Sequence, residues 1–174
     1  MSVKDYETRL YVKDNLSIGK SLVLKNDQSH YIRSVLRLKE NSQIALFNGE
    51  EGEWLSTIKT IAKKFVELEV IEQIKLQEVI SDIWLVFAPI KRTRIDYLAQ
   101  KATELGAGAL WPIFTKYTSV SRVNAERLRS NSIEAAEQSG RLTVPKILDP
   151  IDFDTLIEKW PHDRNLFCLD ETGK

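Results

Sequence analysis

The run at residues 135–141, AAEQSGR, places a carboxylate, an amide, a hydroxyl and a guanidinium side by side where a predicted helix ends. Segments at the ends of helices commonly build binding and catalytic sites. Glu137, Gln138 and Arg141 are therefore candidate catalytic residues. A second interpretation stays open, because Glu137 and Arg141 stand four residues apart, and such a pair on a helix surface contributes only about 0.2–0.5 kcal/mol.

Basic side chains form two further groups with possible chemistry. Lys91, Arg92 and Arg94 follow an apolar run, and Arg33 and Arg37 lie one helical turn apart in an earlier segment. Local clusters of this kind contact nucleic-acid phosphates. Each group is also consistent with a solvated surface.

Composition and motifs exclude several other functions. The motifs GxxxxGK(S/T), GxGxxG and GxSxG are absent, so neither a phosphate-cradling loop nor a hydrolase nucleophile elbow is expected. Two histidines and one cysteine offer no metal-ligand spacing. The formal net charge is zero, so any basic face must be local. The single cysteine, Cys168, rules out an internal disulfide and suits a reducing cytoplasm, and no signal peptide or membrane-spanning run is expected.

The centre of the chain predicts the elements that position these residues. An apolar run at 83–90 is followed by apolar residues at helical spacing and by a second apolar run at 109–114. Thr93 and Asp96 form a capping-box pattern at the helix start, and Gly106 suits a left-handed C-cap. Run, helix and run predict a β-α-β unit with parallel strands. Because such strands are buried on both faces, helices should cover both sides of the sheet.

The N-terminal part, up to about residue 76, has the rhythm of short strands. The predicted strands are 10–12, 21–24, 43–47, 54–61 and 65–71. One helix interrupts them at 27–38, and its predicted apolar face consists of Tyr31, Ile32, Val35, Leu36 and Leu38. Short strands separated by turn residues indicate a small barrel.

The C-terminal part continues the α/β pattern. A second helix is predicted from about 122 to 139 with a glycine as its stop, and an extended piece follows at 146–148. Asp152 caps a third helix, 153–160, and residues 166–169 predict another buried strand. The chain stops soon after, with no helix to cover that strand, so this half is expected to be incomplete. The four tryptophans fall within apolar runs and are expected in the core.

Three blocks of sequence, in this order, resemble one known family. They are HYIRSVLRLKENSQIALFNGEEGEW at 30–54, APIKRTRIDYLAQKATELGAGALWPIFTKYTSV at 88–120 and AAEQSGRLTVPKI at 135–147. They are similar to the RsmE family of 16S ribosomal RNA uridine-N3 methyltransferases. QKATELG and AAEQSGR are the most specific parts, and the similarity runs from about Arg9 to Leu169.

The resemblance implies an α/β fold with a β-barrel N-terminal domain. Residues 1–73 would form a PUA-like barrel that holds RNA, and 77–174 the first part of a SPOUT-type domain with a deep trefoil knot. Family members act as homodimers and transfer a methyl group from S-adenosylmethionine to N3 of one uridine in the small ribosomal subunit. By motif match, Arg141 would stabilise charge on the uracil ring, and Glu137 or Gln138 would orient the ring or the helix end.

The segments that hold the cofactor in this family do not occur in the sequence. They are a GPEGG-like loop and a later LG-x-RILR-like segment, and both would lie beyond Lys174. No cofactor-binding residue can therefore be assigned. We expect a chain truncated at its C-terminus, whose parent protein is an S-adenosylmethionine-dependent enzyme and which is inactive alone.

RNA contacts are predicted from basic residues in both halves. The set is Arg9, His30, Arg33, Arg37, Lys91, Arg92 and Arg94. Open α/β sheets bind ligands at the carboxyl ends of their strands, which favours the loop 91–94. Two other classes stay open: a non-catalytic RNA-binding protein with a dimerising α/β half, and an unrelated nucleotide-binding domain. The missing glycine-rich loop disfavours the second.

Overall fold

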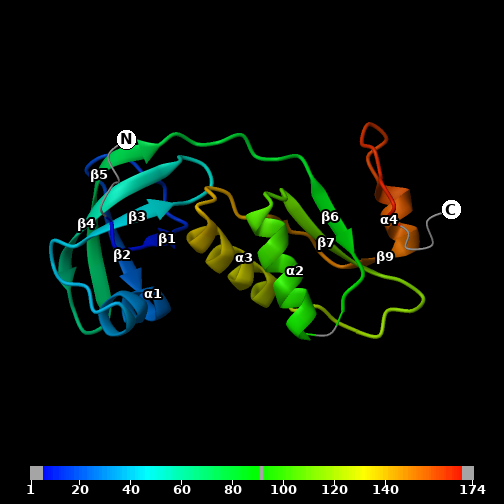
Figure 1. The fold of residues 1–174 in the computed structure, drawn as a ribbon, viewed down its shortest axis with the longest axis horizontal. Helices are drawn as coiled ribbons and strands as arrows, with labels where there is room; N and C mark the ends of the chain where they lie inside the picture. The colour runs from blue at the N-terminus through cyan, green and yellow to red at the C-terminus, as the bar shows by residue number, and fades with distance from the viewer. Residues whose placement is uncertain (1–5, 91, 170–174) are drawn as a thin grey trace.

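The structure, a computed structural model, describes residues 6–90 and 92–169. Two β-sheets organise it, and two helices of the second half, α2 and α3, lie between them in the view of Figure 1, whereas α4 lies beyond the second sheet. In the described part of the chain, no helix is both long and apolar enough to cross a lipid bilayer.

The first sheet is built from the predicted short strands. Its order is β1 (Arg9–Tyr11), β3 (Gln43–Phe47), β4 (Glu53–Ile61), β5 (Phe65–Lys75) and β2 (Ser21–Lys25). β1 runs parallel to β3 and the other pairs are antiparallel. Alternate residues of β5, from Val66 through Leu68 to Val70, are fully buried, as the period of a half-buried strand requires. Within the described residues the sheet ends at β1 and β2, so the expected barrel is a PUA-like half-barrel.

The predicted helix at 27–38 is present as α1 (Asn26–His30) followed by a π-helical turn, η1 (Tyr31–Val35). Its predicted apolar face was wrong at two positions: Tyr31 is 37% and Val35 58% exposed, whereas Ile32 is fully buried. The Leu36 N–H donates to the carbonyl of Tyr31, five residues back, at 2.9 Å. This wider turn rotates the following side chains relative to an α-helix, so a 3.6-residue period misplaces them.

The second sheet confirms the β-α-β prediction. β6 (Trp84–Phe87) leads through α2 (Arg92–Glu104) to β7 (Ala109–Phe114), and the two strands are parallel. Gly106 ends the crossover helix with φ +85°, as expected of a left-handed cap. After α3 (Ala125–Ser139), the short strands β8 (Lys146–Ile147) and β9 (Ile151–Asp152) also pair with β7. Strand β9 was not predicted.

The last helix, α4 (Phe153–Lys159), begins as predicted. The carboxylate of Asp152 accepts the N–H of Thr155 at 2.8 Å. The strand predicted at 166–169 was wrong, since these residues form exposed coil, with Phe167 83% and Leu169 96% exposed. An apolar run becomes a strand only when a sheet edge receives it, and none of the described strands pairs with this run.

The two faces of the second sheet are covered differently. Leu85, Phe87 and Leu110 pack against α2 and α3. Trp84 and Trp111, one residue out of phase, lie on the other face, where their rings contact Trp160 at the end of α4. All four tryptophans are partly buried. Trp54 packs against the core of the first sheet, as expected, whereas Trp84, Trp111 and Trp160 contact one another outside the core clusters.

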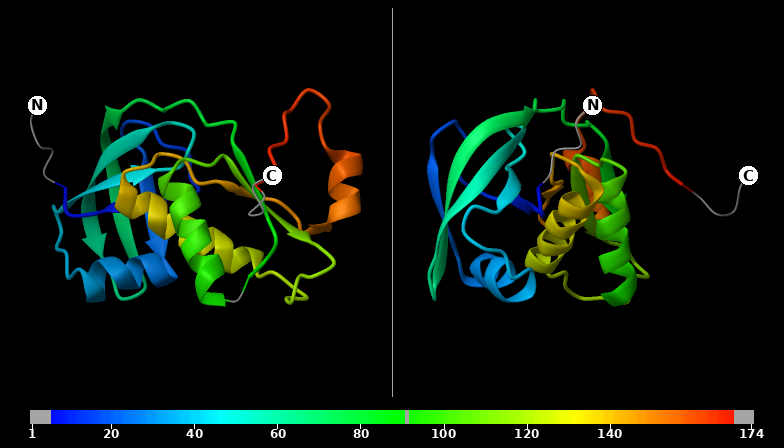
Figure 2. Two further views of the ribbon diagram at one scale, coloured as in Figure 1. Left: turned by 45° about the vertical axis from the view of Figure 1, so that its right-hand side comes forward. Right: turned by 60° about the vertical axis from the view of Figure 1, so that its left-hand side comes forward.

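A small apolar cluster joins the halves where α3 ends beside β1. Phe47 of the first sheet packs with Ala136 and Leu142, and Tyr11 and Val144 lie at its border. The two further views in Figure 2 show the same side-by-side arrangement of α3 and the half-barrel. The C-terminal end of α3 is therefore held by both halves.

The close approach of the connecting segment to Gly108 gives the first prediction. A Cβ at residue 108 would stand 2.0 Å from the backbone oxygen of Ser81, and that segment is tied by the 2.8 Å bond from Gly108 N–H to the Ile83 carbonyl. We expect Gly108→Ala to lower the free energy of unfolding by about 3 kcal/mol, measured by urea denaturation.

The matched control is Gly140→Ala, where nothing lies within 4 Å but φ is +76°. This change costs only the left-handed backbone strain, about 1 kcal/mol. An equal or larger loss for Gly140→Ala would contradict the steric argument for Gly108.

Candidate functional site

The residues of the AAEQSGR run occupy the last turn of α3 and the residues just after it. Asn124 caps the other end of this helix, accepting the Arg127 N–H at 2.9 Å, and Gly140 ends it in the left-handed conformation. Because side chains leave a helix in different directions, residues adjacent in the sequence need not converge on one site. The three candidate catalytic residues show this directly.

Glu137 faces the half-barrel. Its Oε1 accepts the backbone N–H of Tyr11 in β1 at 2.9 Å, and the side chain is partly buried between the two halves. Burial raises the pKa of the Glu137 carboxyl, the bond from Tyr11 opposes this shift, the Glu134 charge adds to it and the Arg9 charge opposes it. Glu137 was suggested to orient either the uracil ring or the helix end, and this geometry suits the second role.

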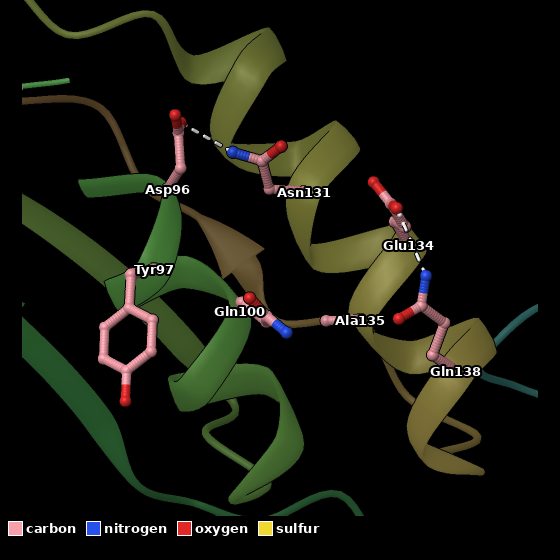
Figure 3. A pocket seen from close by; sticks show the side chains of 7 residues that line it. All are labelled: Asp96, Tyr97, Gln100, Asn131, Glu134, Ala135 and Gln138. Carbon is pink, nitrogen blue, oxygen red and sulfur yellow. Dashed lines mark hydrogen bonds between the residues drawn. The ribbon is translucent and has the colours of Figure 1, made fainter. Parts of the chain in front are cut away.

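Gln138 lies in a groove between α2 and α3 and donates its Nε2 to the carboxylate of Glu134 at 3.2 Å. The groove has a volume of about 260 Å³, and Figure 3 shows the side chains around it. Its lining residues are Asp96, Tyr97, Gln100, Asn131, Glu134, Ala135 and Gln138. Carboxylates, amides and one phenol therefore dominate its surface.

Two hydrogen bonds drawn in Figure 3 order the groove's walls. Asp96 Oδ1 accepts the amide of Asn131 at 2.7 Å, which ties α2 to α3, and the Gln138–Glu134 bond runs along α3. Asp96 is further held by the guanidinium of Arg127 at 2.5 Å. The carboxylate of Asp96 is thus part of the helix–helix contact.

The groove does not fit S-adenosylmethionine. Pockets that bury ligands of that size usually enclose about 300–1,000 Å³ with mainly apolar walls. This groove is smaller, and Ala135 is its one aliphatic lining residue. A second cavity, of about 500 Å³, is lined by Asp82, Trp84, Pro161, Asp163, Arg164 and Asn165, and its walls are also mainly polar, so we derive no step through the cofactor.

Arg141 covers the C-terminal end of α2. Its Nε donates to the carbonyl of Glu104 at 2.9 Å, and its guanidinium lies so close to Gly106 that a Cβ there would stand 3.1 Å from Cζ. A cation is favourable at this negative helix end. Among the described residues, the two terminal nitrogens of Arg141 have no hydrogen-bond partner, so they can still donate to a ligand.

The predicted RNA-contacting residues fall into different surroundings. His30 and Arg37 are exposed, whereas Arg33 donates to the carbonyls of Ala62 at 3.4 Å and of Lys63. Arg94 is exposed on the first turn of α2. α1, η1 and the N-terminal end of α2 lie along the same lower edge of the molecule in Figures 1 and 2. Lys91 and the side chain of Arg92 lie outside the described residues.

Arg9, the remaining residue predicted to contact RNA, is buried and bonded within the protein. Only 9% of the residue is exposed, and four of its five N–H groups have protein partners. A guanidinium in this state has little left to offer a phosphate. Arg9 is buried by residues that lie far away in the sequence, so local sequence patterns do not predict its burial.

The groove residues on α2 were the ones that sequence reasoning missed. Tyr97 and Gln100 lie three residues apart on one face of the helix, and Glu104, outside the groove, continues this polar face opposite the apolar face already noted. Asn131, Glu134 and Gln138 repeat this spacing on α3. The sequence signal that could have predicted the groove was the presence of a polar face on each of two helices that pack together.

Comparisons with known proteins agree with this architecture. Residues 77–174 match the family model described as an RNA methyltransferase domain, and residues 24–71 match an RNA methyltransferase PUA domain. The chain is 36% identical over 152 residues to "Ribosomal RNA small subunit methyltransferase E" of Rickettsia conorii, covering 87% of this chain and 62% of that protein. The protein of the same name from Synechocystis is 30% identical over 166 residues, covering 92% and 54%.

Solved structures give the same picture. Ribosomal RNA small subunit methyltransferase E from Neisseria gonorrhoeae bound to S-adenosyl methionine superposes with a TM-score of 0.80 at 30% identity, over 89% of this chain and 66% of that one. The putative methyltransferase of Legionella pneumophila, also with S-adenosylmethionine bound, gives 0.80 at 26% identity, over 87% and 66%. The chain thus spans less than two thirds of the length of each of these relatives.

A PUA-like half-barrel followed by a parallel α/β sheet, with both parts matching their family models, places the chain in the class of RNA methyltransferases that carry a PUA domain. Within that class it belongs to the RsmE family of ribosomal RNA methyltransferases.

The buried carboxyl of Glu137 gives the second prediction. Because burial raises its pKa above the ordinary 4.5, the folded protein keeps this proton at pH values at which the unfolded chain has released it. The stabilisation is therefore complete below the unfolded pKa and is lost as pH rises through the folded one. Glu137→Gln keeps an acceptor for the Tyr11 N–H and removes the titration. We expect the wild-type free energy of unfolding to fall relative to that of the variant over this pH window.

The measurement is urea denaturation of both proteins at a series of pH values. Glu126→Gln, on the exposed first turn of the same helix, is the control and should leave the pH profile as in the wild type. A difference between Glu137→Gln and wild type that stays constant with pH would rule out the titration of Glu137 as its cause.

Proposed function

We propose that this chain is part of an enzyme that transfers the methyl group of S-adenosylmethionine to N3 of a uridine in 16S ribosomal RNA. The observation that carries the proposal is the match of residues 77–174 to an RNA methyltransferase domain. The printed names of the curated relatives support the ribosomal substrate, and the cofactor bound in the Neisseria and Legionella structures supports the methyl donor. The choice of N3 rests on the family resemblance alone.

The residues at the end of α3 suit the substrate side of this reaction. N3 of uracil becomes nucleophilic when it loses its proton, and the negative charge then spreads to the ring oxygens. The free terminal nitrogens of Arg141 can donate to such an oxygen and stabilise that charge. Gln138 presents an amide that can bind a base edge, and Glu137 fixes the helix end that carries both.

The RNA backbone is proposed to lie along the edge formed by α1, η1 and the first turn of α2. His30 and Arg37 come from the half-barrel, and Arg94, with Arg92 and Lys91, from the other half. On this proposal, residues 1–73 form the domain that holds RNA and 77–174 the catalytic part. The family resemblance further suggests a homodimer acting in the cytoplasm on the small ribosomal subunit.

A genetic test addresses the reaction itself. Deleting the gene that encodes this chain should remove one N3-methyluridine from 16S ribosomal RNA, detected by mass spectrometry of RNA digests, and a wild-type copy should restore it. A copy with Arg141→Ala should restore about 100-fold less methylation, because one stabilising donor is lost from the transition state.

Lys159→Ala is the control in this test, since Lys159 is exposed on α4 and lies outside the groove and the end of α3. Soluble protein and its RNA binding should be retained in both variants. Unchanged methylation after deletion would refute the proposed reaction and favour a non-catalytic RNA-binding protein. Full restoration by Arg141→Ala would remove Arg141 from the mechanism.

Salt-dependent binding tests the proposed RNA-contacting edge. Arg37→Glu combined with Arg94→Glu should weaken binding to a small-subunit RNA fragment and lower the slope of log affinity against log salt by about one unit per residue. Both side chains are exposed, and a glutamate in the first turn of α2 suits the helix dipole, so the fold should be kept.

Lys159→Glu on the exposed part of α4 is the matched charge reversal, and it should leave affinity and slope nearly unchanged. Equal salt slopes for the double variant and the wild type would exclude this edge as the phosphate-binding surface.

A further inference from the structure

Arg9 joins the two halves through a set of contacts that local sequence does not suggest. It belongs to β1 of the half-barrel, yet its guanidinium bonds three backbone carbonyls at the end of α3. Nη1 donates to Ala136 at 2.8 Å and to Glu137 at 2.9 Å, and Nη2 donates to Arg141 at 3.0 Å. The remaining bond, from Nε, goes to the carboxylate of Glu53.

The chemistry of the helix end explains why an arginine is suited to this place. The last four carbonyls of a helix have no intrahelical donors and carry partial negative charge. Ala136 and Glu137 belong to this group in α3. A planar guanidinium presents several N–H groups in a fixed fork and can bind two such carbonyls at once, which the single ammonium of lysine cannot match in geometry.

The first half supplies the counter-charge. Glu53 of β4 is fully buried; its Oε1 accepts from Arg9, and its Oε2 lies 3.2 Å from Nζ of Lys75. The Arg9 guanidinium also lies over the ring of Phe47, with Cζ 4.7 Å from the ring centroid. Contacts within the half-barrel therefore hold the Arg9 guanidinium in place without α3. The same guanidinium then binds the end of α3.

The neighbours of Arg9 make contacts of the same kind. The Tyr11 N–H binds the Glu137 carboxylate at 2.9 Å, and Arg129 of α3 donates to the Tyr11 hydroxyl at 3.2 Å. Strand β1 therefore holds α3 through two of its residues, on alternate positions.

We propose that Arg9 is a positioning residue, which fixes the C-terminal turn of α3, and with it Gln138 and Arg141, relative to the RNA-binding half-barrel. The proposal deepens the proposed function, because it sets where a base-contacting residue stands relative to the surface that holds the RNA. The part that concerns the geometry of α3 can be measured without any activity.

Hydrogen exchange of the 174-residue chain tests the geometric part. In Arg9→Lys, the charge beside Glu53 is kept but the fork is lost, so the amides of the last turn of α3 and of residues 140–142 should exchange about tenfold faster. Amides of β3, β4 and β5 should keep their wild-type rates. Arg127→Lys, at the other end of α3, is the control and should change neither group.

A second variant keeps the test decisive if Arg9→Lys fails to fold. Glu53→Gln keeps an acceptor for Nε but removes the charge that fixes the guanidinium, so the amides at 136–142 should exchange faster than those of β3, β4 and β5. Wild-type exchange in Arg9→Lys, or an equal rise throughout both halves, would overturn the proposal. So would wild-type exchange at 136–142 in Glu53→Gln.

Kinetics of the enzyme of which this chain is proposed to be a part separate positioning from simple stability. With small-subunit RNA as substrate, Arg9→Lys should lower kcat by about 100-fold while KM for RNA stays near the wild-type value, because a small displacement of the reacting groups is enough for such a loss. An unchanged kcat, or a rise in KM alone, would contradict positioning. If the wild type shows no methyl transfer, the proposed function fails, while the exchange experiment still decides the role of Arg9 in holding α3.

Discussion

The arrangement of this protein depends on how the C-terminal end of α3 is accommodated against the edge strand β1. A buried helix end leaves carbonyls without donors, and an edge strand leaves N–H and C=O groups unpaired, and both are costly away from water. Here β1 supplies donors for the carbonyls of α3, and α3 supplies an acceptor for a backbone N–H of β1. Arg9 donates to the helix carbonyls, Glu137 accepts the Tyr11 N–H, and Gln28 donates to the Tyr11 carbonyl at 2.7 Å.

Local patterns in the sequence were sufficient for most of the secondary structure. The strand at 43–47, the capped start of α4 and the glycine ends of α2 and α3 follow from residue periodicity and from backbone preferences that operate over a few residues. Three features needed more than local information: the π-helical turn at η1, the exposed coil at 166–169 and the burial of Arg9. The last depends on partners 44 and 127 or more residues away, so no window of sequence contains it.

Local sequence was also insufficient to predict the geometry of the candidate site. The AAEQSGR run was correctly placed at a helix end, but adjacency in sequence did not bring its functional groups together. Glu137 turns to the half-barrel, Gln138 to the groove and Arg141 to the end of α2. Three different elements surround this helix end, and one residue of the run contacts each of them. The same short run therefore contributes to the contact between the halves, to the wall of the groove and to the cap of α2. The groove is formed by two helices, so predicting it requires knowing how α2 and α3 pack against each other.

The zero net charge conceals a separation of charge that restricts where RNA can lie. Asp96 and Glu134 line the α2–α3 groove, so a phosphate entering it would meet carboxylates, and like charges at short range repel strongly where water is partly excluded. The edge formed by α1, η1 and the start of α2 instead carries His30 and Arg94, with Arg37 two residues beyond η1, beside one exposed carboxylate, Asp27. Phosphate contacts position a nucleic acid, whereas hydrogen bonds to base edges read its sequence. The proposed function therefore requires the phosphates to stay at the basic edge, and only an uncharged base, turned away from the backbone, is compatible with the groove.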